Sequence, residues 1–297
     1  MIKVIATDLD GTLLDENHTL NQITYEALLR AQKQGIRTMI ASGRDYAGAT
    51  ATLGNHELTC DYVVASGAEL RNPQGEILHF ITMEPSCFSE IIRRVGDMPV
   101  LLRFCSKGCD YVIGRGEDLP NLMLKEAKLF FANEGDDESI KKSVMFQNML
   151  KRIQSIDSLE TLLKREIPVF KVFISAQDDT LIPKVEALVA DIPNIVSASS
   201  FANNTELTHI NAQKGPVLKN YIEELGHTME EVMVLGDSMN DYSMLSMDFG
   251  ATVAMENAMP KVKRAAKYIT KPNTENGVAY VINELLEGRL EKLRVNS

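Results

Sequence analysis

Residues 2–12 read IKVIATDLDGT, an apolar run that ends in two carboxylates. The β-branched and apolar residues 2–7 predict a strand buried on both faces, as in a parallel sheet. Asp8 and Asp10 follow at the carboxyl end of that strand, where open α/β sheets bind their ligands. Gly11 permits a tight turn there. A structural turn after the strand would by itself explain the pair Asp8 and Asp10. Other motifs in the chain are therefore needed to distinguish a structural turn from a ligand-binding site.

The composition favours a globular protein and argues against nucleic-acid-binding and membrane proteins. The chain has 297 residues, of which 44% are apolar and 24% charged, so we expect a soluble globular protein with two domains. Its net charge of −10 argues against nucleic acid as a partner, because nucleic-acid affinity rests on Lys and Arg. No stretch has the length of a membrane span, and four cysteines without a CxxC pair predict neither zinc nor disulfides. A cytoplasmic location is expected, with no membrane partner.

Strands and helices alternate at both ends of the chain. Thr19 and Gln22 predict a capping box for the first helix, and Asn72-Pro73-Gln74-Gly75 predicts a hairpin turn. Further buried strands are expected at residues 36–41, 62–65, 232–235 and 251–254, and helices at 214–226, 239–247, 260–267 and 277–286. This alternation predicts an α/β fold with a Rossmann-like parallel sheet. The less regular middle predicts an inserted α+β domain at residues 85–206, which splits a core domain formed by 1–84 and 207–297.

A second acidic cluster follows another apolar strand. Residues 236–241 read GDSMND and bring together Asp237, Ser238, Asn240 and Asp241. Carboxylate, amide and hydroxyl oxygens are the ligands that Mg²⁺ prefers. A helix N-cap would also explain Asp237 or Ser238, but capping and metal binding are compatible.

Two more segments offer groups that bind phosphate. Ser42, Gly43 and Arg44 follow the strand at 36–41 and supply a hydroxyl, a glycine N–H and a cation. Lys214 opens a helix, where its charge and the helix dipole can both face an anion. Each signal is weak alone, but all four segments lie at strand ends or helix starts and can converge on one crevice.

In these motifs the chain resembles the haloacid dehalogenase superfamily, specifically its Cof-type phosphatase branch with an α+β cap. The resemblance runs nearly end to end and rests on DLDGT at 8–12, SGR at 42–44, QKG at 213–215, GDSMND at 236–241, VAMENA at 253–258 and ENGVAYVI at 275–282. Three positions depart from the usual pattern of the branch, and these are Ser66, Asn211 and Glu256. They bear on substrate preference, because none belongs to the acidic pair or to the magnesium cluster.

The resemblance implies a magnesium-dependent phosphomonoester hydrolase. Asp8 would attack the phosphorus atom and carry an aspartyl-phosphate intermediate. Asp10 would act as general acid and then general base, a role that calls for a raised pKa. The ion would lie between Asp8, the main-chain carbonyl of Asp10 and Asp237, with Ser238 and Asp241 in support.

The remaining motif residues would bind the substrate. The set implied for phosphate and substrate binding is Leu9, Thr12, Ser42, Gly43, Arg44, Lys214 and Asn240. The inserted domain would act as a cap that excludes water and recognises the leaving group. We expect small phosphorylated metabolites as substrates, such as sugar, nucleotide or cofactor phosphates, and a monomer or homodimer.

Other functions use the same residue types. A phosphotransferase of this superfamily, such as a phosphosugar mutase, would use Asp8 but transfer the phosphoryl group to a second hydroxyl. A signalling receiver domain also combines an acidic cluster, a phosphorylated aspartate and a lysine, but the large insert favours an enzyme. A binding protein with degenerate catalysis would lack the nucleophile or the acid, and both are present.

Overall fold

The computed structural model describes residues 1–54, 56–114, 118–130 and 135–295. The chain forms two compact units, Met1–Ile81 with Asn211–Ser297, and Thr82–Ile210. The expected insert at 85–206 falls a few residues inside the second unit. Each unit is described separately below.

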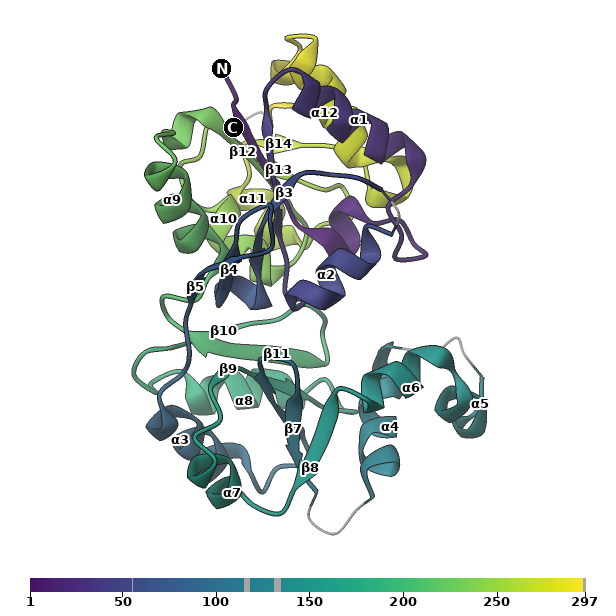
Figure 1. Cartoon of the computed structure of the whole chain (residues 1–297), viewed down its shortest axis with the longest axis vertical. Helices are drawn as coiled ribbons and strands as arrows, with labels where there is room; N and C mark the ends of the chain where they lie inside the picture. Colours follow the sequence, from purple (N-terminus) through teal and green to yellow (C-terminus); the bar gives the residue numbers. More distant parts are fainter. Residues whose placement is uncertain (55, 115–117, 131–134, 296–297) are drawn as a thin grey trace. The chain divides into compact units, whose positions relative to one another are not determined.

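The first unit is built on one sheet (Figure 1). Its strand order is β14-β13-β12-β1-β2-β3-β4-β5. The strands are β1 (Val4–Thr7), β2 (Arg37–Ala41), β3 (Cys60–Val64), β4 (Glu69–Arg71), β5 (Ile77–Phe80), β12 (Val232–Gly236), β13 (Ala251–Ala254) and β14 (Tyr268–Ile269). All pairings from β14 to β3 are parallel, whereas β4 and β5 form an antiparallel hairpin at one edge. The predicted parallel sheet and the hairpin are both confirmed.

Helices cover both faces of this sheet. They are α1 (Gln22–Lys33), α2 (Tyr46–Thr52), α9 (Lys214–Glu224), α10 (Tyr242–Leu245), α11 (Pro260–Ala265) and α12 (Gly277–Leu286). Helices α1 and α12 lie side by side on one face, and α9 packs beside α10 on the other (Figure 1). Strands β1, β3, β12 and β13 are buried along their whole length, as their continuous apolar runs predict.

Short helical turns connect these elements. They are η1 (Leu9–Leu13), η2 (Ala65–Gly67), η3 (Met229–Glu231), η4 (Met239–Asp241), η5 (Asn273–Glu275) and η6 (Leu290–Leu293). The helix expected at 239–247 is therefore a turn, η4, followed by the short helix α10.

The capping prediction for the first helix is wrong. Asn21 is the N-cap of α1, and its side chain accepts a hydrogen bond from the Thr24 N–H. Asn is as good an N-cap as Ser or Thr, and it stands directly before the first helical residue. The Thr19 hydroxyl instead donates to Asp15.

The second unit holds a mixed sheet with strand order β10-β11-β9-β6-β7-β8. Its strands are β6 (Leu101–Ser106), β7 (Asp110–Ile113), β8 (Ile153–Ile156), β9 (Val169–Ser175), β10 (Ile195–Ala198) and β11 (Asn204–His209), and its helices are α3 (Pro85–Val95), α4 (Leu119–Phe130), α5 (Asp137–Lys142), α6 (Val144–Leu150), α7 (Leu159–Lys164) and α8 (Leu181–Val189). One apolar core includes Phe88 of α3 and Phe104 of β6, and a smaller one includes Phe146 of α6. The α+β character expected for the insert is confirmed.

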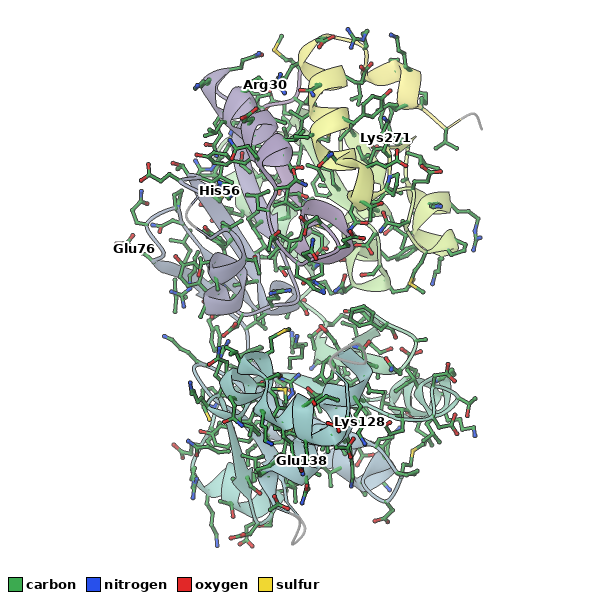
Figure 2. The ribbon with its side chains drawn as sticks, turned by 90° about the vertical axis from the view of Figure 1, so that its right-hand side faces the viewer. Arg30, His56, Glu76, Lys128, Glu138 and Lys271 are labelled. Carbon is green, nitrogen blue, oxygen red and sulfur yellow. The ribbon has the colours of Figure 1, made fainter. Side chains whose placement is uncertain are left out.

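Charged side chains lie on the outside of each unit (Figure 2). Arg30 and Lys271 are exposed on the first unit, and Lys128 and Glu138 on the second. Arg30 also links two helices, because its guanidinium donates to Asn283 of α12 over 2.6 Å. Within the described ranges, every helix is too short or too polar to cross a membrane.

One buried charge lies at the amino ends of the strands, at the edge opposite the acidic motifs. Asp61 of β3 is fully buried and accepts hydrogen bonds from Arg37 of β2 and from the hydroxyl of Tyr221 of α9, both over 2.7 Å. It therefore ties a helix to two strands.

We expect Asp61→Ala to lower the free energy of unfolding by about 3 kcal/mol, because it removes charge-assisted bonds and leaves the buried Tyr221 hydroxyl without the acceptor of its own hydrogen bond. Urea denaturation measures this. The control is Glu223→Ala, which breaks the exposed pair with Lys219 and should cost about 0.5 kcal/mol or less. Equal losses in both variants would contradict the structural role of Asp61.

Candidate active site

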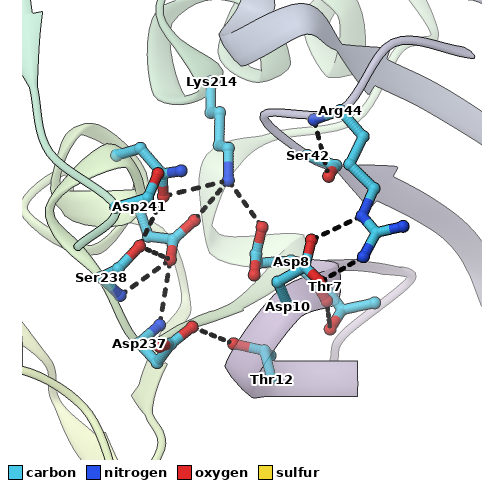
Figure 3. Close-up of polar contacts among 12 residues, drawn as sticks. Thr7, Asp8, Asp10, Thr12, Ser42, Arg44, Lys214, Asp237, Ser238 and Asp241 are labelled. Atoms are coloured by element: carbon cyan, nitrogen blue, oxygen red, sulfur yellow. Dashed lines mark hydrogen bonds and ion pairs between the residues drawn. The ribbon is translucent and has the colours of Figure 1, made fainter. Parts of the chain in front are cut away.

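Three neighbouring strands bring the acidic and hydroxyl motifs to one edge of the sheet. Strand β1 pairs in parallel with β12 on one side and with β2 on the other. Asp8, Asp237 and Ser42 directly follow these strands, so all three lie at the same carboxyl edge (Figure 3). The convergence expected from the sequence therefore follows from the strand order alone.

Lys214 lies fully buried among oxygen atoms at this edge. Its ammonium is 2.7 Å from a carboxylate oxygen of Asp8, 2.7 Å from one of Asp241, and 3.3 Å from the side-chain oxygen of Asn240 (Figure 3). Burial alone would lower the pKa of Lys214, but the negative charges of Asp241 and Asp8 raise it well above its usual value. The lysine is thus a fixed positive charge inside the site.

Asp241 holds the turn that carries the second acidic motif. One of its carboxylate oxygens accepts hydrogen bonds from the main-chain N–H groups of Asp237 and Ser238, over 3.0 and 3.1 Å. Its other oxygen accepts the bond from Lys214. The Ser238 hydroxyl donates to Asn240 over 2.8 Å. Capping of the turn η4 and support of the site are therefore combined in the same residues.

Asp8, Asp237 and Asp241 form a group that fits a metal ion. One carboxylate oxygen of each lies within 4.8 Å of the others. Burial, followed by the charge of Asp241, raises the pKa of Asp8 well above its usual value and that of Asp237 to about 7. Crowded, buried carboxylates that resist ionisation are stabilised when a cation shares their oxygens.

The turn after β1 is fitted closely to Asp237. The Thr12 hydroxyl donates to the Asp237 carboxylate over 2.8 Å. Gly11 has a φ of +76°, and a Cβ at this position would lie 2.5 Å from an Asp237 oxygen. The Gly11 carbonyl accepts a bond from the side chain of Asn257 over 2.8 Å. Glycine is therefore required at position 11 for space as well as for conformation.

Asp10 faces away from this group. Its carboxylate pairs with the Arg44 guanidinium through two hydrogen bonds of 2.5 and 2.7 Å (Figure 3). The same carboxylate lies 3.1 Å from His18 Nδ1. Burial would raise the pKa of Asp10, but the bonds from His18 and Arg44 outweigh burial and hold this pKa well below its usual value. The raised pKa that the expected role of Asp10 calls for is therefore not found in this structure, where its pKa is lowered.

Several motif residues take positions that the sequence did not indicate. Arg44 binds Asp10, and Thr12 binds Asp237, although both were expected to contact substrate. The side chain of Leu9 is fully buried, so only its main chain is available to a ligand. The Ser42 hydroxyl accepts a bond from the Arg44 N–H over 3.2 Å. In this structure these contacts order the motif loops.

Two residues at the site were missed. His18 contacts Asp10 from a loop. The sequence around His18 contains no motif or periodicity that would have indicated this contact. Asn257 was part of a quoted motif, but its side chain was given no role until the structure joined it to Gly11.

Comparison with known proteins agrees with this geometry. A family model of haloacid dehalogenase-like hydrolases matches residues 5–282. The chain belongs to this family. The haloacid dehalogenase core with an inserted α+β unit and the Cof-type resemblance are therefore confirmed.

Curated relatives of this haloacid dehalogenase-like hydrolase are phosphatases. Phosphatase YwpJ of Bacillus subtilis is 28% identical over 296 residues, which cover 96% of this chain and 100% of YwpJ. The 5-amino-6-(5-phospho-D-ribitylamino)uracil phosphatase YwtE of the same organism is 26% identical, covering 97% and 99% of the two chains. A solved haloacid dehalogenase-like hydrolase from B. subtilis superposes with a TM-score of 0.81 at 26% identity, covering 96% and 100%. The chain is a phosphatase of the haloacid dehalogenase type.

The raised pKa of Asp237 predicts a pH dependence of stability in metal-free protein. The folded state holds the proton up to about pH 7, whereas an unfolded aspartate releases it near 3.8. The Asp237 carboxyl therefore holds a proton in the folded state within this window, and its contribution to stability falls as pH rises, by at most about 1.4 kcal/mol per pH unit. We expect Asp237→Asn to reduce this slope. Urea denaturation in EDTA at about pH 5 and about pH 7 measures it. An unchanged slope in Asp237→Asn would contradict the assignment.

Proposed function

We propose that this protein is a magnesium-dependent phosphomonoester hydrolase that forms an aspartyl-phosphate on Asp8. The observation that carries the proposal is the buried ammonium of Lys214 between Asp8 and Asp241, with Asp237 in the same acidic group. An anionic nucleophile can approach an anionic phosphate only where positive charge is fixed beside both. Lys214 supplies such a charge at the nucleophile.

Charge counting supports a divalent cation. When Asp8, Asp10, Asp237 and Asp241 are all ionised they carry four negative charges, and Lys214 and Arg44 carry two positive charges, which leaves two negative charges. The atoms that these carboxylates offer to a metal ion are oxygens, which are the ligands that Mg²⁺ prefers. The ion would be held by Asp8, Asp237 and the main-chain carbonyl of Asp10, with Ser238 and Asp241 in support. When bound, it would neutralise charge on the phosphoryl oxygens.

The protein's own residues supply the nucleophile and the groups that bind the phosphate. Asp8, held 2.7 Å from Lys214, attacks the phosphorus in line. Ser42, Asn240 and the main-chain N–H groups of Leu9 and Gly43 bind phosphoryl oxygens.

Asp10 protonates the leaving oxygen and later activates water. Because Arg44 binds Asp10 here, we propose that the incoming phosphate competes for Arg44. Loss of this pair raises the pKa of Asp10 toward the value that an acid needs.

Small phosphorylated metabolites are the proposed substrates. YwtE acts on a phosphorylated ribityl compound by its name, and it aligns with 97% of this chain. This similarity supports a sugar-like or cofactor-precursor phosphate. Recognition of the leaving group by the inserted unit stays a prediction from the family resemblance.

Asp8→Asn tests the nucleophile. With p-nitrophenyl phosphate and Mg²⁺, we expect phosphate release to fall at least about 1000-fold, because the amide cannot accept the phosphoryl group. EDTA should abolish turnover of wild type, and added Mg²⁺ should restore it. The control is Asp248→Asn, which changes an aspartate whose side chain is 92% exposed and should keep full activity. Turnover that survives in Asp8→Asn would refute the assigned nucleophile.

Asp10→Asn tests the general acid through the leaving group. An alkyl phosphate needs protonation of its leaving oxygen, whereas p-nitrophenolate leaves without it. We therefore expect kcat to fall about 100-fold or more for a sugar phosphate, and much less for formation of the phospho-enzyme from p-nitrophenyl phosphate. Rapid-quench measurement of the first turnover separates this step from hydrolysis. Equal losses for both substrates would exclude proton donation by Asp10.

A further inference from the structure

The turn η2, residues Ala65–Gly67, has an unusual main chain for its composition. Ala65, Ser66 and Gly67 have φ values of +52°, +61° and +100°. Residues with a Cβ rarely adopt such values, and two in succession require support from the surrounding structure. The turn directly follows β3 and is buried.

The turn is bonded to the loop that carries Ser42, Gly43 and Arg44. The Ala65 N–H donates to the Arg44 carbonyl over 2.7 Å, and the Ser66 N–H donates to the Ser42 carbonyl over 3.0 Å. These bonds hold both left-handed residues in place, and they connect the turn to two residues of the proposed site.

Gly67 then contacts the main chain beside Lys214. A Cβ on Gly67 would lie 2.6 Å from the carbonyl carbon of Gln213 and 2.9 Å from its nitrogen. No real Cβ approaches main-chain atoms so closely, so the two backbones are in direct contact.

The residue on the other side of Lys214 is held in the same manner. A Cβ on Gly215 would lie 2.1 Å from the carbonyl oxygen of Ser243, and the Gly215 N–H donates to the Ser243 hydroxyl over 3.1 Å. Lys214 is therefore flanked by two main-chain contacts that only glycine permits. Its own side chain has no exposed surface and reaches three oxygen atoms.

We propose that Gly67, presented by the strained turn Ala65–Gly67, is a positioning residue that sets the place of the Lys214 ammonium relative to Asp8. This inference rests on the proposed function, because it assumes that Lys214 serves the nucleophile. A side chain at position 67 would displace Gln213 and with it the start of α9. Bonds of 2.7 Å to Asp8 and Asp241 do not tolerate such a shift.

A merely structural role makes a different prediction. If the turn only stabilised the fold, a side chain at position 67 would lower the melting temperature and leave kcat of the folded protein unchanged. Displacement of Lys214 would lower kcat of the folded protein, with a smaller effect on KM.

The test compares Gly67→Ala with Gly226→Ala. Gly226 also has a left-handed φ, +81°, and directly follows the last turn of α9, but a Cβ there would have no neighbour within 4 Å. Both substitutions place an alanine at a left-handed φ, which is unfavourable. Only the Cβ of Gly67→Ala would also collide with the main chain of Gln213. With saturating Mg²⁺ and p-nitrophenyl phosphate, we expect kcat of Gly67→Ala to fall about 100-fold, the effect of a displacement of about 1 Å at a catalytic group. Gly226→Ala should lose melting temperature but keep kcat.

The outcomes separate the inference from the proposed function. Equal kcat values for Gly67→Ala and Gly226→Ala, with Asp8→Asn and Lys214→Met inactive, overturn the positioning role alone. Turnover in Asp8→Asn or Lys214→Met overturns the proposed function. If Gly67→Ala is recovered unfolded, Ala65→Gly is added to relieve one left-handed residue. The folded double variant should still show reduced kcat, and wild-type kcat in it overturns the inference.

Discussion

A buried lysine among carboxylates is the constraint on which the site depends. Lys214 has no exposed surface, so its charge must be compensated by protein atoms rather than by water. Asp8 comes from the end of β1 and Asp241 from the turn after β12, and both bonds to the ammonium measure 2.7 Å. These two bonds join three segments that lie far apart in the sequence. The position of the Asp8 carboxylate, the proposed nucleophile, is thus coupled to the packing of α9 on the sheet.

Much of the first unit could be predicted from the sequence because its signals are local. Continuous apolar runs mark β1, β12 and β13 as buried strands, and carboxylates directly after β1 and β12 mark the ligand-binding edge. The N-cap of α1 and the break between η4 and α10 were missed. In both places several short polar side chains stand near one another in the sequence, and any of them could bond to a main-chain N–H group. The structure shows that Asn21 accepts from the Thr24 N–H and that Asp241 accepts from the Asp237 N–H.

The contacts that define the site's electrostatics could not be predicted in this way. Arg44 and Asp10 are 34 positions apart, and a motif does not say whether a guanidinium binds substrate or a neighbouring carboxylate. The left-handed turn Ala65–Gly67 contains two residues, alanine and serine, that give no signal of positive φ. Its conformation is imposed by bonds to Ser42 and Arg44, which exist only once the strands are side by side.

Asp8 and Asp10 show how a single turn separates two carboxylates. Strand alternation would have put both side chains on one side. Instead, Asp10 leaves the strand for η1, and Gly11 reverses the chain with a φ of +76°. Asp10 therefore reaches Arg44 beyond β2, while Thr12 reaches Asp237 beyond β12.

The pKa of Asp8 is raised and that of Asp10 lowered, which is the reverse of what the proposed nucleophile and the proposed general acid need. In the proposed mechanism both conditions would change for the same physical reason when ligands bind. A cation shared by Asp8 and Asp237 would stabilise the ionised form of Asp8, and a phosphate that draws Arg44 away from Asp10 would remove the charge that keeps Asp10 ionised. The two ligands of the proposed reaction would thus correct both protonation states.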